Sequence, residues 1–107
     1  MAAHTAAFNG AVQDGDWGRF AERFTEDARM SFPGLPVPDA VGRAAILEAY
    51  RSAPPDDTIE QTEIDPAHAP DVGPVDLVAV RWSRGGTGTM RITWRGDLVA
   101  ALEVRFV

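Results

Sequence analysis

The chain has 107 residues, a formal net charge of −6 and an isoelectric point near 4.7, and it contains no cysteine. This length suits one domain, residues 1–107, around one core. The acidic balance argues against nucleic acid as a partner, and the lack of cysteine removes disulfides and thiolate chemistry. The N-terminus does not resemble a secretion signal, and no apolar run approaches the roughly 20 residues of a membrane helix, so we expect a cytoplasmic protein without a membrane partner.

Three helices and a strand are predicted in the first half of the chain. Phe8, Ala11 and Val12 form a helical stripe, and Asp16 is the expected N-cap of a second short helix with an aromatic stripe over residues 17–24. The period then changes from 3.6 to 2 over residues 28–32, which indicates a strand. The stretch "GLPVPDAV" is too rich in proline for regular structure. A third helix follows over residues 42–53.

The second half of the chain is predicted to be β-structure. Residues 57–65 form an irregular strand in which Ile59 and Ile64 have opposite parity, as a bulge would produce, and residues 66–74 form a proline-rich loop. Strands over residues 75–83, 88–95 and 98–107 are joined by turns at "RGG" and "RGD". The predicted fold is therefore α+β, with a cone-shaped, curved antiparallel sheet and three N-terminal helices that enclose a pocket.

The motifs of the first half resemble those of the nuclear transport factor 2-like superfamily. The stretches "QDGDWGRFAERFTEDARMSFPG" and "VGRAAILEAY" are most similar to SnoaL-like and ketosteroid isomerase-like proteins. The resemblance covers about half of the chain by recognisable motifs, and the strand order of the remainder is compatible with it. It implies the cystatin-like fold of that superfamily, which hosts isomerases, cyclases, dehydratases, hydrolases and non-catalytic binding modules.

The isomerase residues of that family map mostly onto apolar positions of this chain. The tyrosine that donates to the substrate oxyanion corresponds to Phe8, the general-base aspartate to Phe32, and the protonated aspartate that assists the tyrosine to Met90. The supporting tyrosine of the third helix is kept as Tyr50. The resemblance therefore implies a pocket without the isomerase acid and base, and each apolar position is also a good core residue.

The catalytic residues of other enzymes with this fold are also not found at the matching positions of this chain. Epoxide hydrolases of this shape need polar residues on the first strand, where this chain has Met30 and Phe32. Scytalone dehydratase-like chemistry needs cavity histidines, whereas we place His4 at a frayed N-terminus and His68 in the proline-rich loop. The acidic neighbours of His68 at positions 65 and 71 have no second histidine beside them, so we predict no metal and no cofactor.

Two polar side chains remain as candidate catalysts. The Tyr50 hydroxyl needs a partner once it is buried, and that partner is either a backbone carbonyl or a ligand. Glu63 would be a base only if its strand turned it into the cavity, where burial would raise its pKa. The same strand geometry would decide whether Arg81 faces inward, although the opposite face of its strand is the more apolar.

The leading hypothesis is a protein that binds a small apolar molecule. Its predicted pocket residues are mainly aromatic and methionine side chains: Phe8, Phe24, Met30, Phe32, Tyr50, Met90 and Trp94. One alternative is an isomerase, cyclase or hydrolase that uses residues other than those of the family, with Tyr50 as its acid. A second alternative is a protein-interaction module. The resemblance also implies a homodimer formed through the outer face of the sheet.

Overall fold

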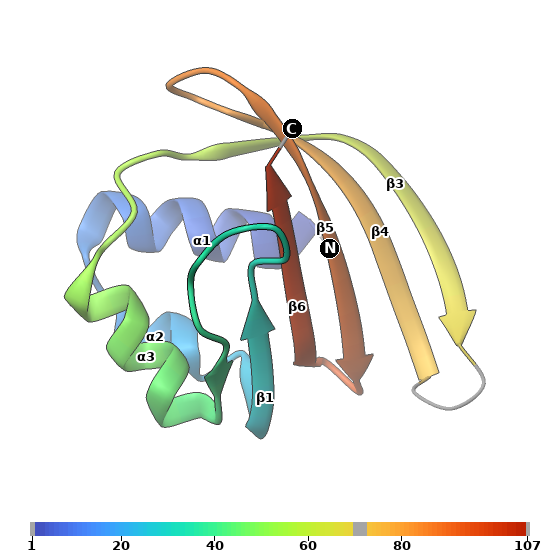
Figure 1. Ribbon diagram of the computed structural model, residues 1–107, viewed down its shortest axis with the longest axis horizontal. Coiled ribbons are helices and arrows are strands. Elements are labelled where there is room, and N and C mark those ends of the chain that lie inside the picture. Colours follow the sequence, from blue (N-terminus) through green and yellow to red (C-terminus); the bar gives the residue numbers. More distant parts are fainter. Residues whose placement is uncertain (1, 70–72, 107) are drawn as a thin grey trace.

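The computed structural model describes residues 2–69 and 73–106 (Figure 1). Within these two ranges nine elements follow one another: α1 (Ala2–Asp14), α2 (Trp17–Ala21), β1 (Phe24–Ser31), β2 (Ala40–Val41), α3 (Arg43–Ser52), β3 (Ile59–Ala69), β4 (Gly73–Trp82), β5 (Thr87–Arg95) and β6 (Leu98–Phe106). None of the helices is long and apolar enough to cross a membrane, among the residues described.

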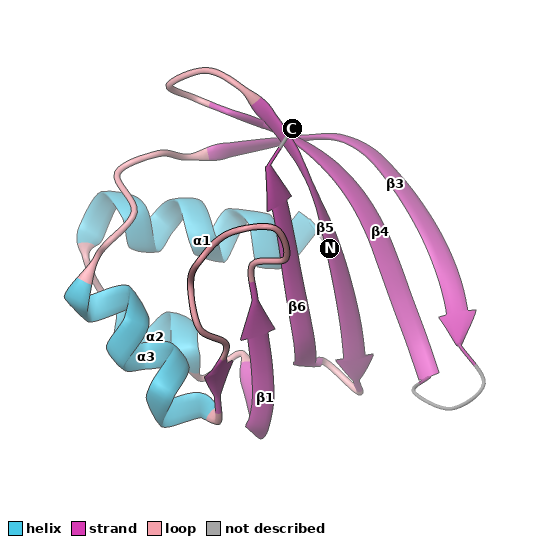
Figure 2. Ribbon diagram, viewed as in Figure 1, coloured by secondary structure: helices cyan, strands magenta, loops and turns pink. Residues whose placement is uncertain are grey.

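The six strands form one strongly curved sheet in the order β2-β1-β6-β5-β4-β3, with the three helices gathered on one side (Figures 1 and 2). All neighbouring strands are antiparallel except β1 and β6, which run parallel. The sheet is not closed into a barrel. The predicted α+β class, with N-terminal helices against a curved sheet, is confirmed.

The second helix is shorter than its aromatic stripe predicts. Asp16 is the N-cap, as expected, and its carboxylate accepts a hydrogen bond from the amide of Arg19 at 3.1 Å. The helix ends after one turn because the amide of Glu22 bonds back to the carbonyls of Arg19 and Phe20. Phe24 is therefore the first residue of β1, which starts four residues earlier than predicted.

Two predicted loops contain strand residues. Ala40 and Val41 form the short edge strand β2 within the stretch that we expected to be irregular, because they pair with Met30 and Arg29 of β1. β3 continues to Ala69, through part of the expected loop. An edge strand has one side free of pairing, and proline is tolerated there, which explains how Pro66 lies within β3. The bulge expected in β3 is confirmed, between residues 61 and 63.

The core lies between the helices and the inner face of the sheet. Its largest fully enclosed side chains include Phe24 and Met30 of β1, Ile46 of α3 and Ile92 of β5. Phe20 of α2 packs against Phe24 with ring centroids 5.5 Å apart. Burial of an aromatic or large aliphatic side chain contributes about 1.5–3 kcal/mol, so this cluster fixes the helices on the sheet.

Candidate functional site

A cavity of about 490 Å³ opens between the helices and the inner face of the sheet. This volume lies in the range of small-molecule sites. Its wall is mostly apolar and draws on α1, β1, α3, β5 and β6: Phe8, Met30, Phe32, Tyr50, Met90 and Leu102. The mouth is bordered by the α3–β3 connection and by the turn between β4 and β5.

Five of the seven residues predicted for the pocket lie on this wall, namely Phe8, Met30, Phe32, Tyr50 and Met90. The other two lie elsewhere. Phe24 is completely enclosed in the core, and Trp94 turns its indole N–H to the carboxylate of Asp76 at 2.9 Å. Phe32 follows the last residue of β1 and is half-buried at the cavity.

His4 also lines the cavity, and the expectation that it lies at a frayed end of the chain is wrong. It is in the first turn of α1 and is 3 % exposed. Its ring centroid lies 5.3 Å from that of Phe20, 6.0 Å from that of Phe24 and 6.2 Å from that of Trp94. The Nδ1 atom is buried and has no hydrogen-bond partner among the described residues.

Burial keeps the His4 imidazole neutral. Desolvation lowers its pKa from 6.5 to about 4, and the positive charge of Arg23 adds to the effect. At neutral pH the ring therefore carries one N–H donor and one bare nitrogen acceptor. A neutral imidazole in an apolar wall can form a hydrogen bond with a bound molecule or exchange a proton with it.

Tyr50 is held by aromatic packing. Its ring stacks on Trp17 with centroids 4.6 Å apart and planes 2° from parallel, and it meets Phe8 and Phe20 edge-on. Burial raises the pKa of the Tyr50 hydroxyl well above its ordinary value of 10. The hydroxyl therefore keeps its proton at any physiological pH and suits the role of a hydrogen-bond donor to a ligand.

Glu63 and Arg81 lie outside the cavity. Glu63 is exposed and pairs with Ala79 of β4, which points away from the buried Val78 and Val80 on either side of it. The inward orientation on which a catalytic role for Glu63 depends is therefore absent. Arg81 is exposed on the same outer face, 3.8 Å from a carboxylate oxygen of Glu60. The residue at position 71 and the side chain of His68 lie outside the described part of the chain.

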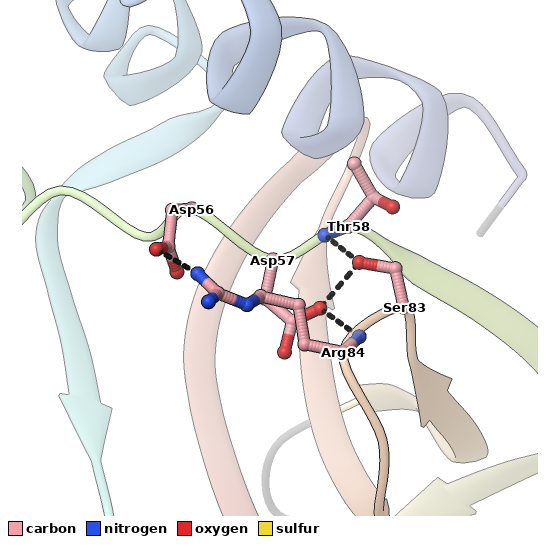
Figure 3. Close-up of polar contacts among 5 residues, drawn as sticks. All are labelled: Asp56, Asp57, Thr58, Ser83 and Arg84. Carbon is pink, nitrogen blue, oxygen red and sulfur yellow. Dashed lines mark hydrogen bonds and ion pairs between the residues drawn. The ribbon is translucent and has the colours of Figure 1, made fainter.

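Polar contacts join the two sides of the mouth (Figure 3). The carboxylate of Asp57 accepts hydrogen bonds from the Ser83 hydroxyl and from the backbone amide of Arg84, the latter at 2.7 Å. The Ser83 hydroxyl oxygen also accepts the amide of Thr58 at 3.0 Å, and the Arg84 guanidinium pairs with Asp56. These contacts fasten the α3–β3 connection, which borders the cavity, to the β4–β5 turn.

Two inward-facing polar residues, His4 and Asp76, were not expected from the sequence, although the pattern around each of them indicates an inward-facing position. His4 lies four residues before Phe8 and seven before Ala11, so it belongs to the same helical stripe. Asp76 shares its parity with Val78 and Val80 and therefore faces inward, where it holds the indole of Trp94. In both cases, a polar residue at the spacing of buried apolar residues is the sequence feature that indicates an inward-facing polar side chain.

The comparisons with known proteins agree with this architecture. The family model described as "SnoaL-like domain" matches residues 5–105, so the chain belongs to the SnoaL-like family. No curated protein matches the chain. A ketosteroid isomerase-like protein from Kribbella flavida DSM 17836 superimposes with a TM-score of 0.72 at 22 % identity, over 98 % of this chain and 76 % of that one.

Two further solved structures share the fold. A protein with a cystatin-like fold from Caulobacter vibrioides has a TM-score of 0.73 at 17 % identity, covering 98 % of this chain and 85 % of its own. A protein from Catenulispora acidiphila, solved in complex with S-DNPA, has a TM-score of 0.69 at 19 % identity, covering 97 % and 88 %. The resemblance to the SnoaL-like and nuclear transport factor 2-like superfamily is thus confirmed at the level of family and fold.

Proposed function

We propose that residues 1–107 form one cytoplasmic SnoaL-like domain that binds a small apolar molecule in the cavity beneath its helices. The observation that carries this proposal is a cavity of about 490 Å³ whose wall is built from aromatic, methionine and aliphatic side chains. Such a wall favours an apolar ligand because burying apolar area from both partners releases about 25 cal/mol per Å². The ligand complex of the Catenulispora protein supports the same use of this fold.

A thermal-shift screen with small aromatic and alicyclic compounds tests the proposal. A ligand at ten times its dissociation constant stabilises the folded state by about 1.4 kcal/mol, which raises the melting temperature by several degrees in a domain of this size. Ala49→Trp places a bulky ring at the cavity wall and should abolish the shift. Ala44→Trp, on an exposed part of α3, is the matched control and should keep it. No shift with any compound in the unmodified protein would refute the proposal.

An enzyme that uses residues outside the family pattern is the second candidate. It is favoured by the presence of two protonatable groups, His4 and Tyr50, on one apolar wall. Tyr50, the acid of this hypothesis, would act there as a hydrogen-bond donor to an oxygen of the substrate, because burial keeps its hydroxyl protonated. Tyr50→Phe should then abolish any turnover found for a compound that binds. Unchanged turnover would remove Tyr50 from the mechanism.

We also propose that two copies associate through the outer face of the sheet. Leu77, Arg91 and Glu103 lie side by side across β4, β5 and β6, and Leu77 is 43 % exposed. A two-fold axis that lies in this face between Arg91 and Glu103 would bring Arg91 of each copy near Glu103 of the other, with Leu77 at the border of the contact. Light scattering at increasing concentration should show a dimer, and Leu77→Glu should return the protein to the monomer. A monomer at all concentrations would refute this association.

A further inference from the structure

A row of apolar side chains on β6 leads from the floor of the cavity to its mouth. Leu102, Val104 and Phe106, here called the β6 row, alternate along the strand, and all three line the cavity. The first two are buried, whereas Phe106 is 53 % exposed. Successive side chains on one face of a strand are about 7 Å apart, so the row is roughly 13 Å long. It therefore connects the enclosed wall to the open surface.

The β1–β2 connection lies at the same end of the sheet as Phe106. The strands β1 and β6 run parallel, with Ser31 paired to Glu103, so both leave the sheet at the mouth of the cavity (Figure 1). Val37 belongs to this connection, lines the cavity and is 48 % exposed. Val37 and Phe106, here called the mouth pair, are therefore continuous with the buried apolar wall, yet about half of each side chain is in water.

The two members of the mouth pair are held in different ways. Phe106 stacks on Trp82, with ring centroids 5.4 Å apart and planes 22° from parallel. Among the described residues, the only hydrogen bond of residues 33–38 joins the amide of Leu35 to the carbonyl of Phe32, within the connection itself. A surface segment with so few hydrogen bonds moves at low cost in free energy. The mouth thus has a fixed aromatic side, and Val37 can adjust to a molecule that lies on it.

A small molecule fits the mouth pair better than a broad partner surface does. The mouth also carries the carboxylates of Asp56 and Asp57, and Asp56 pairs with Arg84. The side chains of Asp56 and Arg84 are 76 % and 66 % exposed. A membrane or a protein that covered Val37 and Phe106 would also take these charged groups out of water, which is unfavourable. A ligand that extends along the β6 row covers the apolar pair and leaves the charged groups solvated.

We propose that the mouth pair is the outer subsite of the cavity and holds one end of an elongated apolar ligand, whose other end lies against Met30 and Leu102. The inference rests on the proposed small-molecule function and specifies the shape of the ligand. A compact ligand that filled only the inner cavity would leave Val37 and Phe106 in water. Each CH₂ group that an elongated ligand adds along the β6 row leaves water, which increases the affinity roughly fourfold.

A matched pair of ligands tests the outer subsite. The methyl and hexyl esters of 4-hydroxybenzoic acid have the same ring and the same polar groups, and they differ only in the length of the alkyl chain. Isothermal titration of the full chain should give a dissociation constant roughly a hundredfold or more lower for the hexyl ester. Val37→Ser and Phe106→Ser should each reduce this ratio by roughly threefold or more, because they weaken only the binding of the hexyl ester. Val41→Ser changes a similarly exposed valine on β2, outside the cavity wall, and should leave the ratio unchanged.

A second readout needs no variant. In isotope-filtered NMR spectra, the hexyl ester should show nuclear Overhauser contacts to the methyl groups of Val37, and the methyl ester should not.

Several results would count against the outer subsite and leave the small-molecule function standing. These are equal binding of the two esters, a ratio that both serine variants at the mouth leave unchanged, and binding of other compounds of the screen but of neither ester. A dimer in light scattering that Val37→Ser dissociates would also overturn it, because a second copy would then cover the mouth pair. Failure of both esters and of the wider compound screen would instead remove the proposed function itself.

Discussion

Acidification should destabilise this protein through His4. In the unfolded chain the imidazole has its ordinary pKa of 6.5, whereas in the folded state burial lowers the pKa to about 4. Between these two values the unfolded state binds more protons than the folded one, so stability falls as the pH falls. Above pH 6.5 the ring is neutral in both states and its contribution is constant.

The size of the effect follows from the two pKa values. Each unit by which the two pKa values differ corresponds to about 1.4 kcal/mol. Lowering the pH from 7 to 4 should therefore reduce the free energy of unfolding by about 3 kcal/mol through His4 alone. A domain of this length has a total stability of about 5–15 kcal/mol, so the loss is easy to measure. Below about pH 4 the ring is protonated in both states and the effect ends.

Urea unfolding at half-unit steps from pH 7.5 to 4 provides the assay, with His4→Phe beside the unmodified protein. The variant keeps an aromatic ring but cannot titrate, so the difference between the two curves isolates the imidazole. At pH 7 the variant should be at least as stable as the parent, because it removes a buried polar atom that no described residue pairs with. Parallel curves for the parent and His4→Phe would refute the burial of a neutral imidazole.

Four further substitutions test the fold and the mouth of the cavity. Phe24→Ala should lower the free energy of unfolding by about 3–5 kcal/mol in urea titration, since this ring is fully enclosed, and a loss below about 1 kcal/mol would contradict its place in the core. Asp57→Ala should cost about 1–3 kcal/mol because two donors lose their acceptor, whereas Asp56→Ala, which removes an exposed ion pair, should cost less than about 1 kcal/mol; equal losses would contradict the arrangement at the mouth. Gly88→Ala should destabilise the sheet, because the new Cβ would lie 2.6 Å from the carbonyl oxygen of Arg105, and an unchanged melting temperature would show that β5 and β6 are not that close.

The position of the helices and strands along the chain was determined largely by local sequence. Side-chain periodicity located the three helices and the last three strands, and Asp16 located the start of α2 through its capping carboxylate. The boundaries that were predicted wrongly depend on contacts with residues that are distant in the sequence. Phe24 continues a helical stripe in the sequence but joins β1 in the structure, and Ala40 forms a strand only because Met30 lies opposite.

The apolar character of the cavity was also predictable, because it follows from residue type at positions of known spacing. Phe8, Met30 and Met90 lie on the wall as strand and helix parity require. Trp94 shares the parity of Met90, and Asp76 shares that of Val78, but parity does not show that these two side chains meet, with the Asp76 carboxylate accepting the indole N–H. Such contacts depend on how neighbouring strands pair, and the residue pattern of a single strand does not show that pairing.

The state of the ionisable groups was decided by the tertiary structure alone. His4 belongs to the stripe of Phe8, yet its low exposure and its lowered pKa arise from rings contributed by α2, β1 and β5. Glu63 faces outward because of its pairing with Ala79. Sequence sets which side chains are apolar and where they repeat, because those properties are local. Desolvation and hydrogen-bond partners depend on what packs around a group, and only the folded chain determines them.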